Sequence, residues 1–285
     1  MDHKLECTRV LETAKHDVCA FCGRHRELTD QHVLPRRLLK VFRPAGKPVK
    51  LAMRHGRGTR RDGRITLHDY PGGYVPKVRA VCGDPYGADG CNGGWMRDLE
   101  HRAAPLVTAL GRGLSMPLSS QSQRELAFWA ATVVATYELM IPNGVGAISA
   151  GQRRALYDAR HALVLPQGFL VAMAQLVAPA GSGFYFMNRG MGEGEKAAHQ
   201  QTTFSVGQLL FLVASWPSDM PPMPIALPDG FAPIPLQVKM TFPPHGLRIG
   251  WDHVLPMIDR YYGLIDPLEV TRSRRWAMGE VSPGS

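Results

Sequence analysis

Two cysteine pairs constrain the fold of this chain more than any other feature. Cys19 and Cys22 are separated by two residues, a spacing typical of a zinc knuckle. Cys82 and Cys91 follow much later, and the segment between them consists almost entirely of turn-forming residues. That segment can loop out, so both sulfurs can reach the same metal. We therefore expect the four thiolates to bind one structural Zn²⁺ and to cross-link two distant segments.

The chemistry of these thiols depends on the compartment of the protein. The N-terminal residues carry charges where a secretory signal needs an apolar stretch, and no later segment is long enough to span a membrane. We expect a cytoplasmic protein without membrane contact, where close cysteine pairs bind metal more often than they form disulfides. Two alternatives remain: the four cysteines are unrelated buried thiols, or His16 or His25 replaces one of them as a ligand. Cys7 is left over.

The positive charge of the chain is concentrated in residues 36–79. This stretch holds 13 Lys or Arg against Asp62 and Asp69, whereas the whole chain carries a net charge of +9. The remainder is therefore slightly acidic. A basic excess between two zinc-binding pairs indicates a surface that faces a polyanion. A solvated basic loop is the alternative.

Hydrophobic periodicity and turn residues predict an α+β protein. We expect helices at 5–14, 36–42, 93–110, 124–140 and 152–164. Strands are expected at 28–35, 64–69, 78–82, 169–177, 184–187, 202–215 and 247–251, with a proline-rich loop at 217–235.

The change in character after Pro117 predicts two domains. Residues 1–115 form a zinc-bound domain with the basic insertion at 36–79. Residues 116–285 form a C-terminal domain of helices and antiparallel sheet, for which the sequence predicts no role.

A short motif lies between the cysteine pairs, and a second follows the last cysteine. The first reads Gln31-His32-Val33-Leu34-Pro35, and the second places Asn92 directly after Cys91. Together with the four-cysteine framework, these motifs resemble the HNH (ββα-metal) endonucleases of bacteria and phages, and the cysteine framework is similar to that of the endonuclease VII type. The resemblance covers residues 19–100 and implies a zinc-stapled ββα-metal domain that hydrolyses DNA phosphodiester bonds.

The resemblance also implies roles for individual residues. Phosphodiester hydrolysis needs a base that deprotonates water and a hard cation that stabilises charge on the phosphate. His32, whose type titrates near neutrality, corresponds to the base. Asn92 corresponds to an oxygen ligand of a catalytic Mg²⁺ or Mn²⁺. An ordinary loop histidine and a helix N-cap are the alternative interpretations.

Gln31 departs from the family pattern, which has Asp or Glu before the histidine. A neutral amide can still offer an oxygen to the metal, so Gln31 remains a candidate ligand and catalytic residue, although it lacks the charge that holds a hard cation. Either Asp30 or Glu100 supplies that charge, or the metal binds weakly, or the site is inactive. If Gln31 is a ligand, Gln31→Glu tightens metal binding.

The expected partner is nucleic acid, in particular double-stranded DNA. The candidate phosphate contacts lie in the basic stretch and are Arg36, Arg37, Arg54, Arg57, Arg60 and Arg61. The rival hypothesis is a non-catalytic, zinc-stapled nucleic-acid-binding module in which Gln31 has disabled the HNH site. An interaction protein that recruits a partner through its C-terminal half is a third class.

Overall fold

The structure is a computed structural model that describes most of the chain. The described residues are 18–42, 51–56, 65–70, 77–83, 89–140, 148–177, 185–191, 199–218, 227, 230–235, 240–243 and 248. The predicted helix at 5–14 and the predicted strand at 247–251 lie outside these residues, apart from residue 248, and so do Cys7 and His16.

The helices are α2 (Arg36–Val41), α3 (Arg97–Gly111), α4 (Ser120–Tyr137) and α5 (Ala150–Ala159), with short turns η1 (Cys91–Met96) and η2 (Glu138–Met140). The strands are β1 (Leu28–His32), β2 (Leu51–Gly56), β3 (Ile65–Tyr70), β4 (Lys77–Cys82), β5 (Met116–Leu118), β6 (Phe169–Gln175), β7 (Tyr185–Met191), β8 (His199–Val206), β9 (Leu209–Ser215), β10 (Ala232–Ile234) and β11 (Met240–Phe242). The mixture of helices and sheets confirms the predicted α+β class.

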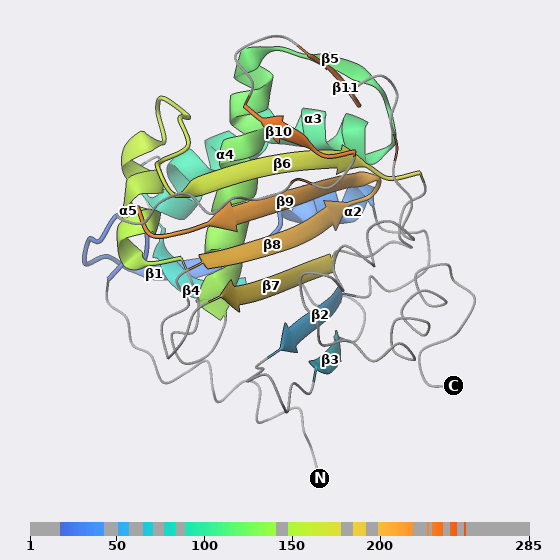
Figure 1. Cartoon of the computed structure of the whole chain (residues 1–285). Coiled ribbons are helices and arrows are strands. Elements are labelled where there is room, and N and C mark those ends of the chain that lie inside the picture. The colour runs from blue at the N-terminus through green and yellow to red at the C-terminus, as the bar shows by residue number, and fades with distance from the viewer. Residues whose placement is uncertain are drawn as a thin grey trace.

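Most of the described strands form one large sheet (Figure 1). Its order is β10-β6-β9-β8-β7-β2-β3, and all neighbours are antiparallel except β2 and β7, which run parallel. Strands β2 and β3 come from the basic insertion, so segments of both predicted domains share this sheet. The predicted boundary at residue 115 lies in the short connection between α3 and β5.

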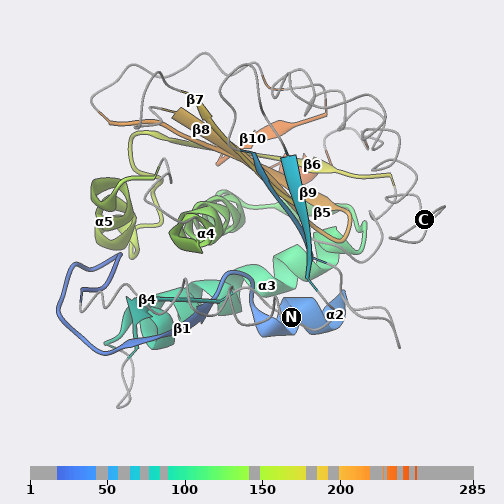
Figure 2. The same ribbon diagram turned by 90° about the horizontal axis from the view of Figure 1, so that it is seen from below.

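Three layers are visible when the sheet is seen edge-on (Figure 2). Helices α4 and α5 lie beneath one face of the sheet, and α3, α2 and the β1–β4 hairpin form the layer beyond them. Helix α4 is buried along almost its whole length, because its apolar residues face both neighbouring layers. Its N-terminus is capped by Ser119, whose side chain accepts a hydrogen bond from the Ser122 amide at 3.0 Å.

The β1–β4 hairpin carries the two motifs found in the sequence. Leu28 lies opposite Cys82 at one end, and His32 lies opposite Lys77 at the other. The register shifts between Thr29 and Gln31, which marks a bulge. Bulges bend a strand and change the direction of side chains, so this irregularity lies where the candidate catalytic residues begin.

One predicted strand is in fact a hairpin. Residues 202–215 were expected to form a single strand, but β8 and β9 run antiparallel and are joined at Gly207, which has a φ of 61°. A side chain at Gly207 would collide with the Gly111 carbonyl oxygen at 2.3 Å. This turn therefore packs directly against the end of α3. Among the described helices, none has the length and hydrophobicity needed to cross a bilayer.

Candidate functional site

The four cysteines predicted to bind zinc form one buried cluster. Their sulfur atoms all lie within 4.8 Å of one another. The Sγ atoms of Cys19 and Cys91 are 3.8 Å apart, and those of Cys22 and Cys82 are 3.7 Å apart. A tetrahedral zinc ion with Zn–S bonds of about 2.3 Å separates its sulfurs by about 3.8 Å. The cluster can therefore hold a metal ion, and its spacing matches zinc.

Backbone groups hold the cluster in place. The Cys19 amide donates to the Arg24 carbonyl at 2.9 Å, and Gly23, with a φ of 66°, closes the tight turn predicted for the knuckle. The Cys82 amide donates to the Cys19 sulfur and the Cys91 amide to the Cys82 sulfur, each at 3.3 Å. Amide donors of this kind stabilise thiolates, as a metal site requires.

Protonation differs among the four thiols. The hydrogen bond from the Cys91 thiol lowers the pKa of Cys19 to about 4. Burial raises the pKa of Cys82 to about 11, and the pKa of Cys91 is raised mainly by its bond to Cys19. A metal that binds four thiolates here therefore displaces protons. Among the described residues the cluster contains cysteines only, and His25 is exposed.

The zinc knuckle is anchored to the helical layer by aromatic packing. The Trp95 ring makes edge contacts with Phe21, Phe128 and Tyr157 at centroid distances of 5.9, 6.3 and 6.5 Å. From α5, Arg154 donates to the Cys22 carbonyl oxygen. The core role predicted for Trp95 is thus confirmed, and the knuckle is packed against both α4 and α5.

His32 is half-buried at the end of β1 and lies among charged residues. Burial lowers its pKa, and the positive charges of Lys77 and Arg36 lower it further, whereas Asp30 acts in the opposite sense. Its Nδ1 atom is buried and has no hydrogen-bond partner among the described residues. The imidazole is therefore neutral at pH 7, which is the form that can accept a proton.

Asn92 connects the start of the helix to β1. Its Nδ2 atom donates to Thr29 Oγ1 at 2.9 Å and to the Asp30 carbonyl oxygen at 3.3 Å. The N-cap of η1 is Gly90, so the N-cap interpretation of Asn92 is wrong. Because the amide nitrogen is used against β1, the side-chain oxygen is the atom left to bind a cation.

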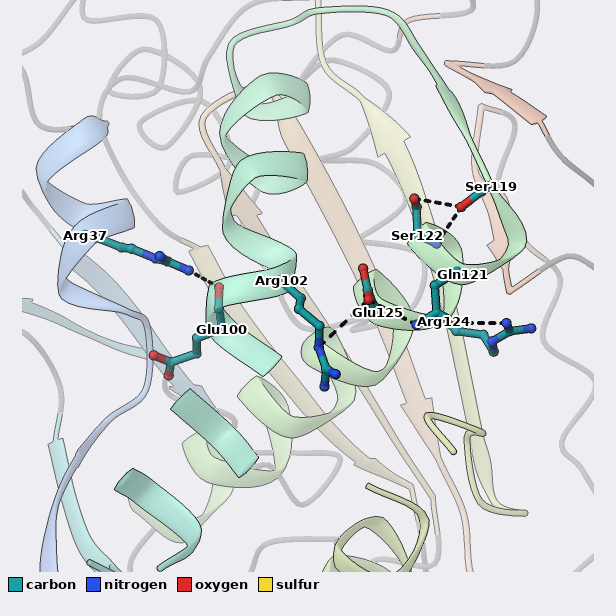
Figure 3. Close-up of polar contacts among 8 residues, drawn as sticks. All are labelled: Arg37, Glu100, Arg102, Ser119, Gln121, Ser122, Arg124 and Glu125. Atoms are coloured by element: carbon teal, nitrogen blue, oxygen red, sulfur yellow. Dashed lines mark hydrogen bonds and ion pairs between the residues drawn. The ribbon is translucent and has the colours of Figure 1, made fainter. Parts of the chain in front are cut away.

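Gln31 points away from His32, into the protein interior. Its Nε2 atom donates to the His32 carbonyl oxygen at 2.9 Å and to Glu100 Oε1 at 3.4 Å. Burial raises the pKa of Glu100 to about 7, although Gln31 and Arg37 oppose this shift. Arg37 donates to the Glu100 backbone oxygen from α2 (Figure 3).

The geometry separates the two carboxylates that were considered as substitutes for the missing acid. Glu100 lies eight residues after Asn92, which corresponds to about 12 Å along a helix. One ion cannot bind both side chains. The carboxylate of Asp30 is exposed and forms an ion pair with Lys77 at 3.5 Å, on the same strand position that Asn92 contacts. Asp30 is therefore the carboxylate available to Asn92, and Gln31 contacts Glu100 instead.

The predicted phosphate contacts divide into three groups. Arg36 and Arg37 are exposed on α2, close to His32 and Glu100 respectively. Arg54 lies on β2, opposite Leu67 of β3 and Met187 of β7. The others, Arg57, Arg60 and Arg61, lie outside the described residues.

The structure also assigns contacts to residues that the sequence did not single out. Lys77 belongs to the predicted basic stretch, and only the strand register places it opposite His32. Arg154 carries no sequence signal for its contact with the knuckle. Comparison with models of known protein families, with curated proteins and with solved structures found no match.

Proposed function

We propose that the chain is a metal-dependent endonuclease of the HNH class that hydrolyses DNA phosphodiester bonds, with His32 as general base. The observation that carries the proposal is the hairpin-plus-helix unit closed by the four-cysteine cluster. It places His32 at the end of β1 and attaches Asn92, at the start of the helix, to the backbone of Asp30. This is the arrangement that the HNH resemblance implies.

The residues around His32 suit phosphodiester hydrolysis. A neutral His32 accepts a proton from the attacking water. Lys77 and Arg36 provide positive charge beside it, which favours a phosphate group at that position. Both residues lower the pKa of His32, so the cations that attract the phosphate also keep the base in its neutral form.

Two metals fit the donor sets. The sulfur spacing of the cysteine cluster fits Zn²⁺ in a structural role. The Asp30 carboxylate and the Asn92 amide oxygen could hold Mg²⁺ or Mn²⁺, which binds few protein oxygens and keeps several waters. Such an ion would stabilise negative charge on the scissile phosphate.

The proposal is tested by nicking of supercoiled plasmid with Mg²⁺ or Mn²⁺. We expect His32→Ala to lower the nicking rate by about 10²–10⁴-fold, the contribution of a general base, while zinc content stays unchanged. His101→Ala is the matched control, because His101 is an exposed histidine on α3. Nicking that survives His32→Ala would exclude His32 as the base.

The second candidate is the non-catalytic nucleic-acid-binding module. Two observations favour it: Gln31 faces Glu100, and the Asp30 carboxylate is engaged with Lys77. On this hypothesis the chain binds DNA with a steep salt dependence but does not nick it with either metal. Measuring binding and nicking on the same preparation separates the two functions.

A further inference from the structure

A buried amide connects the candidate base to the helix behind it. The side chain of Gln31 belongs to a residue that is only 6% exposed. Its NH2 group serves two acceptors, the His32 carbonyl oxygen at 2.9 Å and the Glu100 carboxylate at 3.4 Å. One side chain thus joins the end of β1 to α3.

The chemistry of the contact fixes the orientation of this amide. If nitrogen and oxygen were exchanged, Gln31 Oε1 would lie against two acceptors and both hydrogen bonds would be lost. A carboxylate at position 31 has the same difficulty, because it accepts hydrogen bonds and cannot donate them when ionised. The contact therefore requires a donor, and glutamine supplies one.

No neighbouring side chain in the described pocket replaces that donor. The pocket beside Gln31 and Glu100 is lined by α4, including Thr132 and Thr136. Both threonine hydroxyls donate to carbonyl oxygens of their own helix, each at 2.8 Å. Glu100 is held in turn from α2, where Arg37 donates to its backbone oxygen (Figure 3).

We propose that Gln31 and Glu100 form a brace that positions the backbone of His32, so that Gln31 is a positioning residue and not a ligand of the catalytic metal. The inference rests on the proposed role of His32 as base. It also reverses the sequence-based expectation for Gln31→Glu. That substitution removes the donor and brings two carboxylates together in a buried site, where like charges repel.

Four variants test the brace. Gln31→Met keeps the length of the side chain without the donor, and Glu100→Leu removes the acceptor. Glu100→Gln retains an acceptor oxygen and is the conservative rescue. Glu125→Leu is the matched control, because Glu125 is also a largely buried glutamate, paired with Arg102 at 3.8 Å and remote from β1 (Figure 3).

We expect Gln31→Met and Glu100→Leu to lower the kcat for plasmid nicking about tenfold with little change in KM, since a displaced base slows chemistry without weakening binding. Hydrogen–deuterium exchange of residues 28–34 should accelerate in the same two variants. Glu100→Gln and Glu125→Leu should stay within about twofold of the original protein in kcat. Melting temperatures of all variants report whether a loss is global.

Exchange and catalysis make two failures distinguishable. If the original protein does not nick DNA but exchange of 28–34 accelerates in Gln31→Met, the nuclease proposal fails and the brace stands. If Gln31→Met changes neither exchange nor kcat, the brace is overturned. Tighter Mn²⁺ binding and faster nicking by Gln31→Glu would also overturn it, because that outcome requires residue 31 to be a metal ligand.

Discussion

The two ends of the β1–β4 hairpin were predicted from the same stretch of sequence, with different results. At the Leu28–Cys82 end, all four predicted ligands lie in one cluster. At the His32–Lys77 end, the predicted residues are divided: Gln31 faces the interior, whereas His32 lies among charged residues on the other side. Adjacent residues of a strand point to opposite faces, so adjacency in a motif does not place two side chains in one site.

Removing the cluster is the strongest way to break this comparison. We expect Cys82→Ser to abolish zinc binding and to unfold the hairpin. Structural zinc contributes about 10–16 kcal/mol in small zinc-binding peptides, which is comparable to the whole stability of a domain. Zinc content by elemental analysis and unfolding by circular dichroism measure the effect.

Cys7→Ser is the matched control for this experiment and should retain one zinc per chain. A Cys82→Ser protein that keeps its zinc and its melting temperature would show that the cluster does not hold the hairpin together.

Glu100 sharpens the comparison through pH. Its pKa is raised from 4.5 to about 7, so the folded state disfavours the ionised form. Stability is therefore lost as the pH rises from about 4.5 to about 7. Glu100→Gln removes this penalty, and we expect the variant to gain about 3 kcal/mol relative to the original protein at pH 8 compared with pH 4.

Denaturant unfolding at a series of pH values measures that difference. Glu125→Gln provides the control on the neighbouring helix α4. A stability difference between Glu100→Gln and the original protein that does not change with pH would contradict the burial of an ionisable Glu100.

The basic insertion tests whether the histidine end faces nucleic acid. Replacing Arg54, Arg57, Arg60 and Arg61 by glutamine should flatten the plot of log affinity against log salt, by at most about 3.6 in slope, because each lost phosphate contact releases fewer counterions. Fluorescence anisotropy with labelled duplex DNA measures the slope. Arg112→Gln, at the exposed end of α3, should leave it unchanged, and an unchanged slope in the quadruple variant would place the binding surface elsewhere.

The smallest predicted effect concerns the contact that connects the knuckle to α5. Arg154→Met retains the aliphatic stem but loses the hydrogen bond to the Cys22 carbonyl oxygen. Because the side chain is about half-exposed, at 51%, we expect a loss of about 1 kcal/mol with zinc retained. Thermal unfolding measures it, with Arg124→Met as control, whose guanidinium contacts Gln121 of its own helix. Equal melting temperatures for the two variants would show that the contact contributes nothing.

Helices were the most predictable elements of the fold. The expected helix at 36–42 is α2, and the one at 124–140 overlaps α4, because apolar residues at helical spacing report the buried face directly. Sheet partners were less predictable. The strand at 64–69 was expected, but neither β2 nor its pairing with β7 was, since strand pairing between distant segments leaves no local pattern.

The sequence by itself determined the residues of the metal cluster, because four thiols in two spaced pairs have one common use in a reducing environment and a tetrahedral ion permits little variation in their geometry. Tertiary structure alone decided the surroundings of His32. Which face of β1 packs on α3, which carboxylate Gln31 meets and which lysine lies opposite the histidine all depend on strand register and helix placement. Those contacts join residues far apart in the chain, and their side chains carry no local signal of the partner that folding brings to them.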